Sequence, residues 1–75
     1  MDKIYYQLKR ETSKYNKYMK WHLSYFREDK SLLSSDWFRT EKSAQSAIEL
    51  ANWNAKRGFP IGDKIIFYEY LPLEV

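Results

Sequence analysis

The residues best suited to chemistry are the basic and aromatic side chains between Lys9 and Lys20. Glu11 is the only acidic residue in this stretch. The candidate binding residues are Lys9, Arg10, Lys14, Tyr15, Lys17, Tyr18 and Lys20. Ammonium and guanidinium groups bind phosphates, and exposed rings stack on bases or fill pockets of a partner protein. The pattern predicts a surface for a negatively charged partner, and an ordinary solvated hairpin end is the alternative.

The side chains that usually perform catalysis are nearly missing. His22 is the only histidine, and there is no cysteine. Ser24 shares a strand face with His22, but nothing in the sequence identifies an acidic residue that would orient the imidazole. Gly58 and Gly62 are explained by a helix end and a turn, so no glycine-rich phosphate loop remains. We therefore predict neither an enzyme nor a cofactor or metal site.

Two amphipathic strands flank the basic stretch. Lys3 to Arg10 alternates apolar and polar residues, and Tyr18 to Phe26 does so again. This period of two is typical of strands with one buried face, and the two segments predict a hairpin. Their connection, Glu11 to Lys17, has no glycine for a tight turn, so we expect a longer, mobile loop.

One helix is predicted from Thr40 to Arg57. Thr40 is a suitable N-cap, and Gly58 follows as the residue that ends the helix. The buried stripe is expected to be Ala44, Ala47, Ile48, Ala51 and Ala55. Because four of these five are alanines, the helix can lie close to a surface rich in aromatic side chains.

The other segments have weaker signals. Arg27 to Asp36 is polar and predicts a loop, and we expect Trp37-Phe38 to plug the end of the core in preference to forming a short strand. Phe59 to Asp63 is turn material. Lys64 to Leu71 predicts a strand with apolar residues on both faces, as in a central strand or one covered on both sides.

Together these elements predict an α+β fold of order β-β-α-β over residues 1–75 as a single domain. It is a two-layer arrangement, in which an antiparallel three-stranded sheet carries one helix packed on one face. The opposite face is then expected to show Tyr5, Tyr18, His22, Phe26, Tyr68 and Tyr70. Tyr5 and Tyr68 are candidates for stacking on bases, for a protein contact, for a homodimer interface or for simple cross-strand packing.

Trp53 lies on the side of the predicted helix opposite Ala44. It either packs beneath the Arg27–Asp36 loop or stands exposed as an anchor for a partner protein. We include it among the candidate binding residues.

Charge is unevenly distributed along the chain. Residues 1–30 hold eight Lys or Arg against four Asp or Glu, and residues 31–75 hold five against six. This asymmetry predicts a basic face for nucleic acid or for an acidic protein surface. No apolar run reaches the length of about 18 residues that a membrane helix needs, and the amino-terminal residues lack the apolar core of a signal peptide. We expect a cytoplasmic protein with no membrane partner.

Two stretches resemble a known group of proteins. Phe38-Arg39-Thr40-Glu41-Lys42-Ser43-Ala44 at the helix start and Ile65-Ile66-Phe67-Tyr68-Glu69-Tyr70 in the last strand are similar to those of small ββαβ proteins encoded by phages and mobile elements. The resemblance implies a stoichiometric inhibitor of a host defence or nucleic-acid-handling protein, as anti-CRISPR proteins are, acting in the host cytoplasm. It assigns no role to a single residue. The sequence therefore predicts a non-enzymatic protein that occludes a partner's surface, the partner being a protein or a nucleoprotein complex. The alternative is a basic nucleic-acid-binding module.

Overall fold

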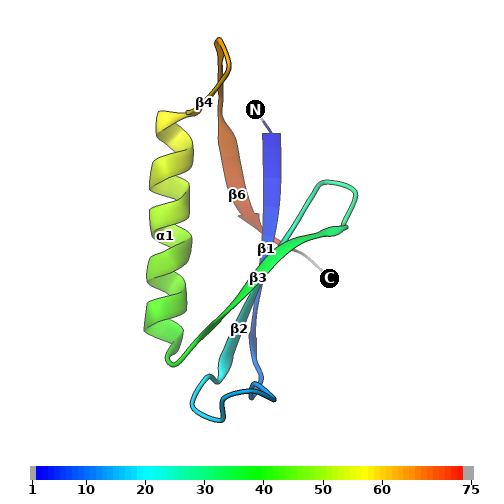
Figure 1. Cartoon of the computed structure of the whole chain (residues 1–75), viewed down its shortest axis with the longest axis vertical. Coiled ribbons are helices and arrows are strands. Elements are labelled where there is room, and N and C mark those ends of the chain that lie inside the picture. Colours follow the sequence, from blue (N-terminus) through cyan, green and yellow to red (C-terminus); the bar gives the residue numbers. More distant parts are fainter. Residues whose placement is uncertain (1, 74–75) are drawn as a thin grey trace.

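A computed structural model describes residues 2–73, in which one helix packs against a four-stranded sheet (Figure 1). The elements are β1 (Asp2–Arg10), β2 (Trp21–Phe26), β3 (Leu32–Phe38), α1 (Glu41–Arg57), β4 (Phe59–Ile61), β5 (Lys64–Ile66) and β6 (Tyr68–Pro72). The predicted α+β class with one helix is confirmed for this part of the chain. Within residues 2–73, no helix is long and apolar enough to cross a membrane.

The sheet is mixed, with the strand order β3-β2-β1-β6. The pairs β1–β2 and β2–β3 are antiparallel, β6 runs parallel to β1, and β4 and β5 form a separate small hairpin. The prediction of three antiparallel strands is therefore wrong in both number and direction. The parallel strand follows from the position of α1, because the chain runs along the helix before it returns beside β1. Such a crossover needs about a dozen residues or more.

Strand β3 occupies part of the segment predicted as the Arg27–Asp36 loop. It also contains Trp37 and Phe38, so these two residues extend a strand and do not plug the core. The middle of β3 is formed by two serines and an aspartate, which give no apolar alternation. At the edge of the sheet most of these side chains are exposed, and polar residues are therefore tolerated there.

The predicted strand from Lys64 to Leu71 is interrupted at Phe67. Its first part is β5, which folds back on β4 around Gly62-Asp63, and its second part is β6. The two-sided apolar pattern predicted a central strand, but β6 lies at an edge of the sheet. The apolar residues on both faces belong to two different strands and not to one central strand. Ile65 of β5 is 63% exposed, so it is not buried as a central strand would require.

Helix α1 begins and ends where the sequence predicts. The Thr40 hydroxyl accepts a hydrogen bond from the backbone N–H of Ser43 at 3.1 Å, and the N–H of Gly58 donates to the carbonyl of Ala55 at 3.1 Å. Gly58 has a positive φ of 81°, and the side chain of Ile65 lies where a Cβ would be. Glycine is therefore required at this position. The stripe faces the sheet, with Ala44, Ile48 and Ala55 buried and Ala47 and Ala51 half-buried.

The core lies between α1 and the sheet face that carries Ile4 and Leu23, which are 8% and 0% exposed. The parallel register places Tyr70 beside Ile4, and Tyr68 lies one pleat earlier on the same face. The prediction that Tyr68 and Tyr70 lie on the open face is therefore wrong, because pairing with β1 sets which way the side chains of β6 alternate. Tyr5 does lie on the open face.

Tyr70 links the helix to the sheet. Its backbone N–H donates to Oδ1 of Asn52 on α1 at 3.1 Å, and its ring meets that of Tyr25 edge to face at 5.5 Å. Burial is the main cause that raises the pKa of both phenols above the ordinary value of 10.0. The charges of Tyr70 and Asp36 raise the pKa of Tyr25 further, as the charge of Tyr68 does for Tyr70.

These two phenols predict a loss of stability at alkaline pH. Because the folded-state pKa values are raised, the stabilisation is complete below pH 10 and is lost as the pH rises through the folded-state values. We expect the free energy of unfolding, measured by urea denaturation, to decline above about pH 10 and to decline less in Tyr25→Phe. The matched control is Tyr15→Phe, since Tyr15 is 98% exposed. An equal decline in both variants would contradict the role of Tyr25.

Candidate functional site

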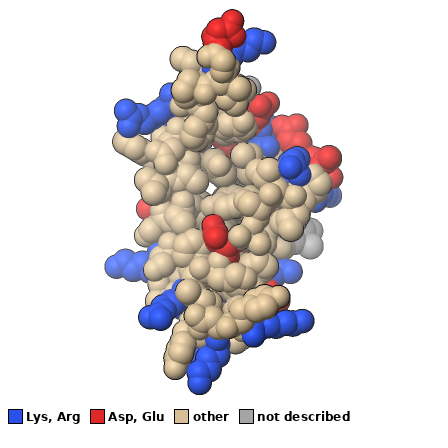
Figure 2. Space-filling view, viewed as in Figure 1, with Lys and Arg blue, Asp and Glu red and all other residues tan. Residues whose placement is uncertain are grey.

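Basic side chains gather at one end of the molecule. There the 11–20 loop meets the ends of β1 and β3 and the start of α1, as the hydrogen bond from the Lys20 N–H to the Phe38 carbonyl shows. On the face in Figure 2, Lys and Arg surround this end and most of the acidic side chains lie in the other half. We define the basic end as Lys9, Arg10, Glu11, Lys14, Lys17, Lys20, Arg39, Glu41 and Lys42. Its formal charge is +5, whereas the remainder of the sequence carries −2.

The loop of the basic end is closed by backbone hydrogen bonds. The N–H of Glu11 donates to the carbonyl of Lys20 at 3.0 Å, and the N–H of Ser13 donates to that of Met19 at 2.9 Å. Ser13 is buried, and its hydroxyl accepts from the N–H of Tyr15 at 3.2 Å. The loop is longer than a two-residue turn, as the sequence predicts, and these hydrogen bonds give it a defined shape. Its cations are therefore held on a defined framework.

Two tyrosine rings are exposed among these cations. Tyr15 is 98% exposed and Tyr18 is 61% exposed. The Lys17 ammonium lies 5.5 Å from the centre of the Tyr18 ring, and the Arg39 guanidinium lies 5.9 Å from it. A ring between two cations is suited to a ligand that combines a flat surface with negative charge. The ring can stack on the flat surface, and the cations can neutralise the charge.

A row of side chains continues from the basic end across the open face of the sheet. Lys9, His22 and Trp37 occupy paired positions on β1, β2 and β3. The His22 ring stacks flat on Trp37, with centroids 4.1 Å apart and planes 4° apart, and its Nδ1 lies 3.1 Å from Oε2 of Glu11. Tyr5 lies on the same face, about 13 Å further along β1 from Lys9. The open face thus carries a stacked pair of rings, which we call the His22–Trp37 platform, next to the cations.

Most of the binding residues predicted from the sequence therefore lie together. Of these, the basic end contains Lys9, Arg10, Lys14, Lys17 and Lys20, and its loop carries Tyr15 and Tyr18. Tyr5 lies apart on the open face, Tyr68 lies on the helix side, and Trp53 points outward from α1. The sequence reasoning missed Arg39, Lys42 and the His22–Trp37 stack. No local sequence pattern predicts that these residues lie near the loop. Their positions depend on β3, whose end lies beside the 11–20 loop.

Outward apolar side chains mark a second surface on α1. Trp53 is 57% exposed and Leu50 is 58% exposed, and the Arg57 guanidinium lies 4.7 Å from the Trp53 ring. The alternative in which Trp53 packs beneath the Arg27–Asp36 loop is therefore wrong. Beyond the end of α1, the β4–β5 hairpin exposes Ile61 and Ile65, at 55% and 63% (Figure 1). Trp53, Leu50 and this hairpin together form what we call the apolar surface.

The exposure of Trp53 predicts a small effect on stability. We expect Trp53→Ala to change the melting temperature by no more than about 4 °C, because surface substitutions usually change stability by less than about 0.5 kcal/mol. In a chain with Trp21→Phe and Trp37→Phe, the emission of Trp53 should be red-shifted and readily quenched by iodide. Blue-shifted emission protected from iodide would show that the indole is covered.

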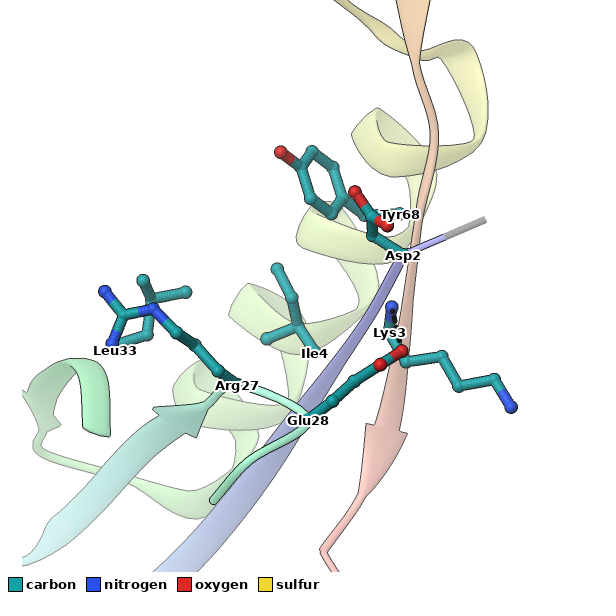
Figure 3. Close-up of a pocket in the computed structure, with 7 residues that line it drawn as sticks. All are labelled: Asp2, Lys3, Ile4, Arg27, Glu28, Leu33 and Tyr68. Carbon is teal, nitrogen blue, oxygen red and sulfur yellow. Dashed lines mark hydrogen bonds between the residues drawn. The ribbon is translucent and has the colours of Figure 1, made fainter. Parts of the chain in front are cut away.

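An open pocket of about 390 Å³ lies beside the β2–β3 hairpin (Figure 3). Its lining is Asp2, Lys3, Ile4, Arg27, Glu28, Leu33 and Tyr68. The Arg27 guanidinium donates to the Ser31 hydroxyl at 3.2 Å and to the Leu32 carbonyl at 3.1 Å, so it holds the hairpin. The Glu28 carboxylate accepts from the Lys3 N–H at 3.3 Å. With two charges of each sign, the pocket has no net preference for an anion or a cation.

Charge and exposed rings are the features that distinguish these surfaces. Within residues 2–73, no group of three or more His, Cys, Asp or Glu side chains is placed to hold a metal ion. The strongest concentrations of charge and of exposed rings lie at the basic end and on the neighbouring open face. Comparison with protein-family models, with curated proteins and with solved structures finds no significant match.

Proposed function

We propose that this is a non-enzymatic binding protein that holds single-stranded nucleic acid at its basic end. The observation that carries the proposal is the gathering of seven Lys and Arg side chains around the exposed rings of Tyr15 and Tyr18. Cations of this kind neutralise phosphates and release counterions, and exposed rings stack on bases. The two kinds of group alternate along one bonded loop, so one strand can meet both.

The rings favour a single strand over a duplex. In a duplex the bases already stack on one another, and a surface loop reaches mainly the phosphates. Tyr15 and Tyr18 would then have no part in binding. Unpaired bases can stack on both rings and on the His22–Trp37 platform, which lies on the open face next to Lys9.

Fluorescence anisotropy with a labelled oligo-dT strand and a duplex of equal length tests this proposal. We expect tighter binding of the single strand, with log K falling against log salt by about 0.7 for each phosphate neutralised. Tyr15→Ala with Tyr18→Ala should weaken binding by about 1–3 kcal/mol per base lost and leave the salt slope unchanged. The proposal is contradicted if neither DNA binds at low salt, or if the duplex binds as tightly and the tyrosines have no effect.

A second candidate function is supported by the apolar surface. Exposed apolar side chains that gather on one surface mark protein interfaces, and Trp is favoured as an anchor there. Trp53, Leu50 and the β4–β5 hairpin supply such side chains. In this alternative the protein is encoded by a phage or mobile element and occludes a host nucleic-acid-handling or defence protein in the cytoplasm, as the resemblance to small ββαβ inhibitors implies.

Capture from host lysate separates the two candidates. Binding to a protein partner should survive nuclease treatment, decrease in Trp53→Ala and persist when Lys14 and Lys17 are both changed to Glu. If capture is lost on nuclease treatment and in the variant with Lys14 and Lys17 changed to Glu, but persists in Trp53→Ala, the partner is nucleic acid. That result would contradict the occlusion function.

A further inference from the structure

The two edges of the sheet are protected very differently. On β6, the N–H of Tyr70 donates to Asn52, Pro72 has no N–H to offer, and α1 packs more closely against this strand than against any other. On β3, no residue of the 2–73 range pairs with the outer edge (Figure 1). Five of the seven β3 side chains are exposed. One edge is thus covered, and the other presents free backbone donors and acceptors.

Strand β3 carries few of the usual features that prevent strand pairing. Natural edges carry lysine, proline or a bulge that twists the strand away. The β3 sequence contains no lysine or proline, and Asp36 is its only charged residue. Its one bulge lies at Leu33, opposite Tyr25 and Phe26, and beyond it Ser34 to Phe38 pairs regularly with β2. A regular five-residue edge therefore remains open.

We propose that a second copy of this chain pairs antiparallel with β3, with Ser35 opposite Ser35 of the second copy. Two four-stranded sheets then become one continuous sheet. In this register Asp36 lies opposite Ser34 of the second copy, so no carboxylate meets another across the junction.

Neighbouring registers are less favourable. A two-fold axis at Asp36 would place two carboxylates opposite each other, which is destabilising in a sheet. An axis at Ser34 would place Asp36 opposite Leu32 of the second copy. An axis at Trp37 would bring Thr40, the cap of α1, into the pairing region. Ser35 is the centre that avoids all three conflicts.

The position of α1 leaves room for this dimer. A two-fold axis normal to the sheet puts both helices on one side and both open faces on the other. Because α1 lies nearer β6 than β3, the helices lie away from the new junction. Ser35 lies on the open face with Ser24 and is exposed, so its side chain can be changed without entering the core. The inference does not depend on nucleic-acid binding.

Charge exchange at Ser35 tests the proposal, with mass measured by sedimentation equilibrium over a dilution series. The wild type should reach twice the 9.2 kDa of one chain as concentration rises. Ser35→Lys and Ser35→Glu should each stay monomeric, because like charges meet on the axis, and an equimolar mixture of the two should form a heterodimer. Ser46→Lys, on the exposed side of α1, is the control and should dimerise as the wild type does.

A cysteine provides a second measurement that does not rely on repulsion. The chain has no cysteine, and opposed Cα atoms in antiparallel strands lie about 4.5–5.5 Å apart, within reach of a disulfide. Ser35→Cys should cross-link readily on mild oxidation, and Ser46→Cys should not. A wild type that stays monomeric at every concentration, a Ser35→Lys variant that still dimerises, or equal cross-linking at both positions would overturn the proposal.

Discussion

Replacing both Lys14 and Lys17 with glutamate is expected to weaken binding of single-stranded DNA about 60-fold at roughly 50 mM salt. Each phosphate contact contributes about 0.7 to the slope of log K against log salt. Its contribution to log K itself falls to zero near about 1 M salt. The loss of two contacts therefore lowers log K by about 1.8 at 50 mM and makes the slope shallower by about 1.4. Anisotropy titrations at several salt concentrations measure both quantities.

The matched control is the pair Lys56→Glu and Lys64→Glu. It changes the net charge by the same amount, but both lysines lie outside the basic end and are exposed. Its affinity for the single strand should stay close to that of the wild type, and the melting temperatures of both double variants should too. If both double variants weaken binding of the single strand equally, affinity depends on the total charge of the protein. The basic end would then not be the binding site.

Leu23→Ala is expected to lower the free energy of unfolding by about 2–5 kcal/mol. Leu23 is 0% exposed and lies in β2, between β1 and β3 and beneath α1. The truncation removes apolar contacts and leaves a cavity that the surrounding strands cannot close. A chain of this size has a total stability of about 4–11 kcal/mol, so the melting temperature should fall by roughly 10 °C or more.

Leu50→Ala removes the same atoms from an exposed site and serves as the control. Leu50 is 58% exposed on α1, where alanine is also a good helix former. Its free energy of unfolding should change by less than about 0.5 kcal/mol, as measured in the same urea experiments. Equal losses at Leu23 and Leu50 would contradict the position of the core.

The features that could be predicted from the sequence are those with local causes. Thr40 and Gly58 mark the ends of α1 through hydrogen bonds within a few residues of each end, and the alanine stripe follows helical periodicity. Strands β1 and β2 alternate apolar and polar residues and are neighbours in the chain. The loop residues of the basic end are contiguous in sequence, so most of that surface was predicted as well.

The features that were missed depend on contacts between distant segments. Strand β3 has a polar middle that an edge position tolerates, so its pattern is typical of a loop. The direction of β6 depends on the crossover through α1. The parallel register with β1 places Tyr68 on the helix side, whereas the sequence predicted it on the open face. Arg39 joins the basic end only because β3 returns to the loop.

The parallel pairing of β6 with β1 has a consequence for how the chain is made. Strand β1 is synthesised before the other strands of this sheet, yet its outer edge has no partner until residues 68–72 have been synthesised. Until then α1 also lacks Tyr70, the strand residue to which Asn52 is bonded. Unpaired edges and uncovered apolar surface make partly folded chains prone to aggregate. Nascent chains that stop before β6 should therefore be removed by proteases or accumulate as aggregates, because the sheet is completed only after β6 has been translated.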